Sequence, residues 1–140
     1  MNPCIFCEIL QGTAESSIVY RDNLVTAFMD IQPINPGHLL VIPNAHAACL
    51  ADLQPETGAH MFTVAQILAQ GIRDSELPCE GINLFLADGE AAMQEVFHVH
   101  LHVIPRCAGD GFGLQFPEWY STRPPRLELD AAAESIKIAT

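Results

Sequence analysis

The stretch Phe97-His98-Val99-His100-Leu101-His102-Val103-Ile104 alternates apolar side chains with histidines over eight residues. Successive side chains of a β-strand point to opposite faces, so the alternation predicts one strand with two distinct faces. The face that enters a core carries Phe97, Val99, Leu101 and Val103. The other face carries His98, His100 and His102 in a single row, with neighbours about 6.5–7 Å apart along the strand.

Three interpretations of this histidine row differ in their chemistry. It could be an ordinary solvated face, although such faces are usually filled with Thr, Ser, Lys and Glu. It could bind a catalytic metal ion, because His-x-His on a strand is a common zinc-binding arrangement. It could attack phosphorus, because a neutral imidazole offers a nucleophilic nitrogen near pH 7 while its other nitrogen holds a proton against an acceptor such as a carbonyl. We favour the third interpretation, with His100 as the nucleophile, because the middle residue has a hydrogen-bonding neighbour on each side.

The segments that precede the row predict an α+β domain. Residues 18–30 are typical of a hairpin, and residues 38–42 and 82–86 are short apolar strands. Between these two strands, apolar residues recur at helical spacing from Pro55 to about Arg73. This order predicts an antiparallel meander sheet packed on one face by one long helix.

The C-terminal part differs in composition. Residues 107–125 are rich in Gly and Pro and predict a surface loop, whereas residues 127–138 predict a short helix. A chain of 140 residues can bury one proper core. We therefore expect a domain over residues 1–106 and a C-terminal extension, residues 107–140, packed on the same domain.

The charge of the chain disfavours several classes of partner. Seventeen acidic residues against six Lys and Arg give a net charge of −11, which repels nucleic acid. No apolar run reaches the roughly 18 residues that a membrane span needs, and the N-terminal residues lack the pattern of a secretory signal. We expect a cytoplasmic protein with no nucleic-acid or membrane partner.

Cys4 and Cys7 form a Cys-x-x-Cys pair, which is half of a tetrahedral zinc site. Two reduced core cysteines are one alternative, and a thioredoxin-like redox pair is another, although no βαβ unit surrounds the motif. The other two zinc ligands would have to come from elsewhere in the chain. His46 follows the end of a predicted strand, and His98 begins the histidine row.

The histidine row also resembles a known signature. Residues 98–104 are similar to the motif of the histidine triad (HIT) superfamily of nucleotide hydrolases and transferases. Four other segments resemble the bacterial branch of that family, in the same order along the chain: residues 4–9, 28–31, 36–43 and 94–97. The resemblance covers residues 3–106. It implies a HIT-like fold and a homodimer in which ten strands form one sheet.

The resemblance also implies a role for each matching residue. His100 would attack the α-phosphorus and form a covalent nucleotidyl intermediate, His102 would contact the phosphate, and His38 would support the hydrogen bonding of the triad. A purine nucleotide would be bound by Asp30 at the ribose, by Phe6, Ile31 and Leu40 around the base, and by Gln94, Glu95 and Val96 at the phosphate turn. A structural zinc would be held by Cys4, Cys7, His46 and His98.

These roles predict an enzyme that acts on a nucleoside phosphoramidate or a dinucleoside polyphosphate. Two residues depart from the family pattern, since Ala87 stands where an amide residue is usual and Met93 where glycine is usual. Both lie near the predicted phosphate turn. They favour the alternative of a nucleotide-binding or scaffold HIT protein with little or no turnover, whereas His100 favours the enzyme.

Overall fold

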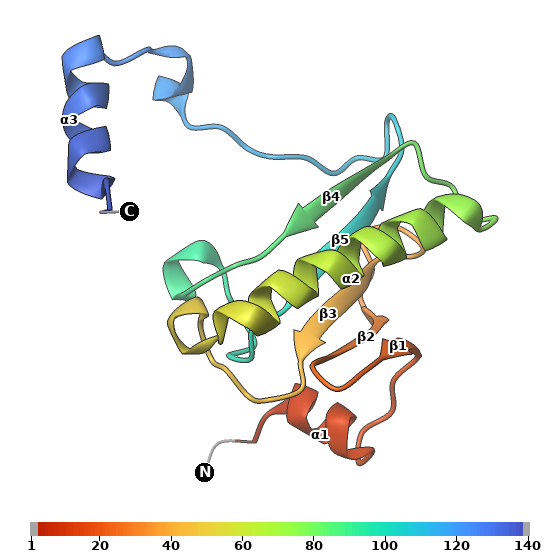
Figure 1. Ribbon diagram of the computed structural model, residues 1–140. Coiled ribbons are helices and arrows are strands. Elements are labelled where there is room, and N and C mark those ends of the chain that lie inside the picture. Colours follow the sequence, from red (N-terminus) through yellow and green to blue (C-terminus); the bar gives the residue numbers. More distant parts are fainter. Residues whose placement is uncertain (1–2, 139–140) are drawn as a thin grey trace. The chain divides into compact units, whose positions relative to one another are not determined.

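The computed structural model describes residues 3–138 and has a mixed α and β architecture (Figure 1). Its helices are α1 (Ile5–Gln11), α2 (Pro55–Asp74) and α3 (Arg126–Ile136). Its strands are β1 (Ile18–Arg21), β2 (Val25–Met29), β3 (Leu39–Pro43), β4 (Gly81–Phe85) and β5 (Leu101–Arg106). The predicted α+β class, the hairpin and the long helix are confirmed.

The five strands form one sheet in the order β1-β2-β3-β5-β4, and every neighbouring pair is antiparallel. The first three strands form a continuous meander. Helix α2 then carries the chain from β3 to the far edge of the sheet, and β5 returns to fill the place between β3 and β4. The predicted antiparallel sheet with one long helix is confirmed, but the meander is continuous only as far as β3.

The two faces of the sheet have separate apolar clusters. Helix α2 lies along one face (Figure 1), and its buried side chains pack with residues of β2, β3 and β5 such as Val25, Val41 and Val103. On the opposite face, α1 packs Phe6 and Ile9 against residues of β2 and β3, namely Phe28, Leu40 and Ile42. The sheet therefore has a core on the α2 side and a second apolar layer on the α1 side.

Helix α1 is not predicted by the hydrophobic pattern, because seven residues are too few for a helical period to be visible. Its signal lies at its end. Gly12 has a φ of 81°, and its N–H bonds to the carbonyls of Glu8 and Ile9. This is a left-handed helix terminus of the kind that favours glycine.

The histidine strand begins later than predicted. Strand pairing in β5 begins at Leu101, which is opposite Val41 of β3. Before it, the side chain of His98 donates to the carbonyl of Pro43, 2.8 Å away. The N–H of Val99 bonds instead to the carbonyl of Ala47, at 2.8 Å. The prediction that Phe97 enters the core is wrong, since its side chain is 45% exposed, whereas Val99 and Val103 are in the α2 core as expected.

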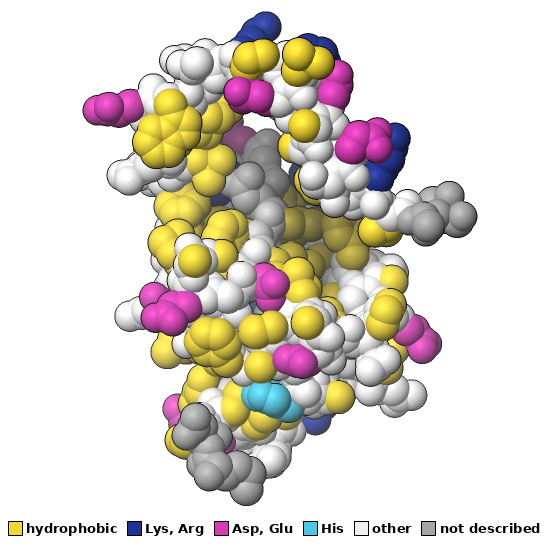
Figure 2. All heavy atoms as spheres, turned by 90° about the vertical axis from the view of Figure 1, so that its left-hand side faces the viewer, with side chains coloured by type: hydrophobic (Ala, Val, Ile, Leu, Met, Phe, Trp, Pro, Cys, Tyr) yellow, Lys and Arg dark blue, Asp and Glu magenta, His cyan; other side chains and the backbone are white. Residues whose placement is uncertain are grey.

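The chain divides into two compact units after Asp110. Residues 111–138 are all exposed, including α3 and large apolar side chains such as Trp119 and Leu127. Apolar side chains lie among scattered acidic ones on the face drawn in Figure 2. The predicted C-terminal helix is confirmed, while its packing on the first unit stays a prediction. No helix in residues 3–138 is long and apolar enough to cross a membrane.

Candidate active site and metal centre

His100 lies at the centre of the histidine row, just before β5. Its Nδ1 lies 2.8 Å from the carbonyl oxygen of His98. A carbonyl oxygen can only accept, so Nδ1 carries the proton and Nε2 keeps its lone pair. The His100 ring is buried and packs edge-on against Phe6 of α1, with ring centroids 5.1 Å apart. The geometry therefore leaves Nε2 as the nucleophilic nitrogen.

His38 and His102 form a hydrogen-bonded pair whose protons are placed by the backbone. The amide N–H of Ile34 donates to Nδ1 of His38 at 3.0 Å, so the proton of His38 must be on Nε2. That Nε2 lies 2.9 Å from Nδ1 of His102 and donates to it. The proton of His102 is therefore on its own Nε2. The carboxylate of Asp30 lies 3.5 Å from the same Nε2 of His38.

Burial keeps this pair uncharged near neutral pH. It lowers the pKa of His38, although the nearby Asp30 carboxylate acts in the opposite direction. Burial, together with repulsion from His100 and His38, lowers the pKa of His102 to about 4. Each ring therefore has one donor and one acceptor nitrogen at pH 7.

Several residues predicted to contact a nucleotide lie on the α1 face, beside the histidines. Phe6 and Leu40 belong to one apolar cluster, and Leu40 is opposite His102 in the β3–β5 register. Asp30 follows β2 and is half-buried, with Oδ1 accepting from the N–H of Gln32 at 2.8 Å. Ile31 is 91% exposed and packs in neither cluster.

The predicted phosphate turn is held together by Gln94. This side chain is buried, and its Oε1 accepts from the N–H of Gly89 at 2.8 Å. Its Nε2 donates to the carbonyls of Ala48 and Val96, at 2.7 and 3.1 Å. Glu95 is exposed, and Val96 is half-buried against the α1-face cluster. The structure thus gives Gln94 a role in shaping the turn.

Met93 has an unusual backbone conformation. Its φ is 69°, which makes it the one non-glycine residue with positive φ in the described part of the chain. A left-handed conformation costs a residue with a side chain about 1–2 kcal/mol. The side chain is 76% exposed, whereas Ala87 is buried. Met93 therefore has a backbone conformation that favours glycine, the residue that the family pattern suggests for this position.

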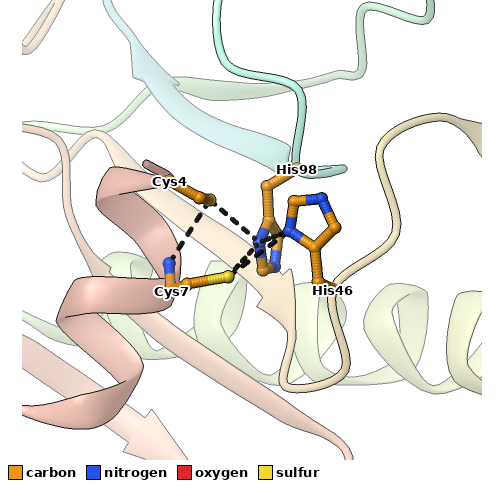
Figure 3. A group of neighbouring side chains, drawn as sticks. All are labelled: Cys4, Cys7, His46 and His98. Atoms are coloured by element: carbon orange, nitrogen blue, oxygen red, sulfur yellow. Dashed lines mark hydrogen bonds between the residues drawn. The ribbon is translucent and has the colours of Figure 1, made fainter. Parts of the chain in front are cut away.

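Cys4, Cys7, His46 and His98 point toward one another (Figure 3). The two cysteines come from the start of α1, His46 from the segment after β3, and His98 from the segment before β5. Three of the four sulfur–nitrogen distances are 3.3, 3.5 and 3.6 Å, and the two Nδ1 atoms are 3.2 Å apart. A tetrahedral zinc separates sulfur and nitrogen ligands by about 3.5 Å and two nitrogens by about 3.4 Å. The donor set and its spacing fit zinc.

An outer hydrogen bond of His98 leaves a lone pair directed into this cluster. Nε2 of His98 donates to the carbonyl of Pro43, so the Nδ1 that faces the sulfurs has a lone pair. Burial raises the pKa of the Cys7 thiol, and its hydrogen bond with Cys4 raises it further. A bound cation reverses such a shift because it favours the thiolate. The same His98 holds the proton of His100 with its backbone carbonyl, so the cluster and the candidate nucleophile share one residue.

Comparison with known proteins agrees with the histidine signature. The family model described as HIT domain matches residues 11–109. The chain belongs to the HIT family. Its structure is similar to the crystal structure of a HIT family protein from Bacillus anthracis, with a TM-score of 0.87, 40% identity, and 95% of this chain and 94% of that one covered. HIT proteins comprise nucleotide-binding proteins and hydrolases, and the chain is assigned to these classes in general.

Two further HIT relatives bear on metal and substrate. A Zn-bound histidine triad family protein from Mycobacterium smegmatis superposes with a TM-score of 0.76 and 38% identity, covering 92% of this chain and 96% of that one. Adenylylsulfatase HINT3 from Arabidopsis thaliana is 32% identical over 135 residues, which are 96% of this chain and 66% of that protein.

His60 is the one histidine of the chain that lies neither with the candidate catalytic histidines nor in the cysteine–histidine cluster. It pairs with the carboxylate of Asp22 at the hairpin turn, and Asp22 also accepts from the hydroxyl of Tyr20 at 2.6 Å. The hydrogen bond from His60 lowers the pKa of Asp22 most, and the hydrogen bond from Tyr20 lowers it further. The pair joins α2 to the β1–β2 turn and has a structural role.

Proposed function

We propose that this HIT protein hydrolyses a nucleotidyl compound, of the nucleoside phosphoramidate or dinucleoside polyphosphate type, through a covalent intermediate on His100. The observation that carries the proposal is the 2.8 Å bond from His100 Nδ1 to the His98 carbonyl, which leaves Nε2 unprotonated. A nucleophilic imidazole divides one difficult displacement at phosphorus into two easier ones.

In the first step, Nε2 of His100 attacks the α-phosphorus. A phosphorus–nitrogen bond forms, the bond to the leaving group breaks, and the leaving group takes a proton from solvent. In the second step, water attacks the same phosphorus, the bond to His100 breaks, and a nucleoside monophosphate is released with loss of a proton. His102 donates from its Nε2 to a non-bridging oxygen in both steps, where negative charge accumulates.

The surroundings of the triad support a nucleotide as the group transferred. Phe6 and Leu40 offer an apolar surface to a purine, with Ile31 at its solvent side. Asp30 offers a carboxylate to the ribose hydroxyls. Gln94 shapes the turn from which Glu95 and Val96 would bond the phosphate. The name of the Arabidopsis relative, an adenylylsulfatase, supports an adenylyl group in particular.

A structural zinc held by Cys4, Cys7, His46 and His98 belongs to the same proposal. The ligand spacing and the Zn-bound mycobacterial relative support it. The zinc would fix α1, and with it Phe6, against the histidine row. No step of the reaction passes through this ion.

The proposed setting is a homodimer in the cytoplasm, with no nucleic-acid or membrane partner. Strand β4 lies at an edge of the sheet and exposes Leu84 and Phe85, at 38% and 41%. An unpaired edge with apolar side chains favours pairing with a second copy.

The test is hydrolysis of adenosine 5′-phosphoramidate. The protein is incubated with this compound, and AMP is sought by chromatography. We expect AMP to form, and its absence would contradict the enzyme. Binding of AMP in calorimetry without any turnover would favour the nucleotide-binding or scaffold alternative. The exposed Met93 beside the phosphate turn supports that alternative.

A further inference from the structure

The loop between β2 and β3, residues 31–37, is folded around His38. The N–H of Asp30 bonds to the carbonyl of His38 at 3.0 Å, and the N–H of His38 bonds to the carbonyl of Asn35 at 3.1 Å. The N–H of Ile34 reaches the ring itself, at Nδ1. The proton on His38, and through it the proton on His102, therefore depends on where this loop holds one backbone amide.

The loop has no regular structure of its own to hold that amide in place, because two prolines and a glycine interrupt it. It does lie close to β5. A Cβ atom added to Gly37, whose φ is 98°, would come within 3.3 Å of the Pro105 ring and 3.0 Å of the Leu77 side chain. The glycine permits this close approach, but it supplies no directional bond.

Asn35 supplies the directional bonds. Its side-chain Nδ2 donates to the carbonyl of Pro105 at 2.9 Å and to the Asp110 carboxylate at 2.8 Å. Pro105 lies in β5, three residues after His102. One amide side chain thus joins the loop that carries the Ile34 donor to the strand that carries the receiving histidine.

The carboxylate that receives Asn35 is itself fixed. Nε and Nη2 of Arg106 donate to the two oxygens of Asp110 at 2.7 and 2.8 Å, in a bidentate arrangement, and the Asp110 side chain is 8% exposed. A bidentate arginine–carboxylate pair has a fixed geometry. Asn35 therefore bonds to a rigid acceptor, and its two hydrogen bonds fix the position of its side chain.

We propose that Asn35 is a positioning residue for the triad: anchored on Pro105 and Asp110, it holds the Ile34 amide against His38, so that His38 and His102 both keep their protons on Nε2. This inference deepens the proposed function, because the tautomer decides whether His102 can donate to a phosphate oxygen. In the other tautomer, the Nε2 of His102 has a lone pair and repels that oxygen.

The test measures the tautomers directly, by long-range ¹H–¹⁵N correlation of the imidazole rings in the full-length, ligand-free protein at pH 7. In the wild type, we expect the Nε2–H form at both His38 and His102. In Asn35→Ala, we expect a mixture of tautomers at both residues. Asn35→Ser, whose hydroxyl is too short to reach both acceptors, is a second variant in case the first folds poorly. The matched control is Asn83→Ala, which removes an exposed amide that accepts from Arg106 at 2.7 Å and leaves Asn35 and Asp110 in place.

Turnover gives the second readout. We expect kcat of Asn35→Ala to fall about tenfold or more with KM nearly unchanged, as happens when a residue behind a reacting group is removed. A wild-type His38 with its proton on Nδ1 would overturn the proposal, and so would wild-type tautomers in both Asn35 variants. The spectra need no substrate, so the proposal is decided even if no AMP is released and the proposed function fails.

Discussion

Two clusters of side chains in this molecule have the residue types of a metal site, but they differ in their protons. Cys4, Cys7, His46 and His98 form one, and Asp30, His38 and His102 form the other. In the first, the two Nδ1 atoms are 3.2 Å apart, close to the nitrogen separation around zinc, and His98 directs a lone pair inward. In the second, the facing nitrogens are 2.9 Å apart, and the bond from Ile34 places a proton between them.

The difference shows that the outer hydrogen bonds assign each cluster its chemistry. In the first cluster, the carbonyl of Pro43 accepts from Nε2 of His98, which leaves the lone pair of Nδ1 free to bind a cation. In the second cluster, the amide of Ile34 donates to Nδ1 of His38, so the Nε2 that faces His102 is a hydrogen-bond donor instead. His100 lies between the two, because its Nδ1 is held by the first and its ring lies 5.0 Å from that of His102.

The largest expected effect comes from removing His100, the candidate nucleophile that lies between the two clusters. His100→Ala should lower the turnover of adenosine 5′-phosphoramidate on the order of 10⁴-fold, because the nucleophile is lost. His60→Ala is the matched control, since it removes a histidine with a structural partner outside the site. A His100→Ala protein that is nearly as active as His60→Ala would exclude the covalent mechanism.

The metal content tests the comparison itself. We expect about one zinc per chain in freshly purified protein, near zero in Cys7→Ser, and no change in Asp30→Asn, measured by elemental analysis. Chelation should lower the Tm of the wild type, because zinc binds the folded state. Zinc that remains in Cys7→Ser and is lost in Asp30→Asn would show that the metal binds the cluster of Asp30, and it would contradict this account.

The departures from the family pattern should have an intermediate effect. Ala87→Asn together with Met93→Gly should raise kcat about 10- to 100-fold, since each lost hydrogen bond to a charged group is worth about 1.5–3 kcal/mol. Met93→Gly alone should raise the free energy of unfolding by about 1 kcal/mol, because it relieves a φ of 69°. Steady-state kinetics and urea unfolding measure the two effects. An unchanged or lower kcat would mean that Ala87 and Met93 fit another leaving group.

The smallest effect concerns pH and the second cluster. Histidine in the unfolded chain takes up a proton near pH 6.5, whereas burial lowers the pKa of His102 to about 4 in the folded protein. Between these values the unfolded state binds more protons, so stability falls as the pH falls, by at most about 1.4 kcal/mol per pH unit for this group. Urea unfolding at several pH values should show a shallower dependence in His102→Asn than in the wild type. Equal slopes would mean that His102 is not held neutral.

Much of the fold could be predicted from local pattern. The hairpin, the 20-residue helix and the apolar strands have periods that span enough residues to be seen. Helix α1 is too short for that. Before β5, His98 and Val99 bond to the carbonyls of Pro43 and Ala47 instead of pairing as a strand, and no local pattern predicts these bonds. Phe97 continues the alternation of the row but lies beyond the end of the pairing, which is why its exposure could not be predicted.

The site could be predicted as residue types but not as hydrogen bonds. The histidines and cysteines stand out in the sequence, and the structure brings His46 to Cys7 across 39 positions. The groups that place the protons are the Ile34 amide and the carbonyls of Pro43 and His98, together with the Asn35 side chain that we propose positions the Ile34 amide. The first three are backbone groups with no sequence signal, and Asn35 resembles any polar loop residue. Their roles follow only from the positions of their partners.

The stereochemistry at phosphorus tests the covalent mechanism most directly. An adenosine phosphoramidate analogue with a chiral phosphorothioate is hydrolysed in ¹⁸O-labelled water, and the configuration of the product is determined. Each in-line displacement inverts the phosphorus, so attack by His100 followed by water predicts net retention. Net inversion would show that water attacks the substrate in a single step, and it would contradict the nucleotidyl-His100 intermediate.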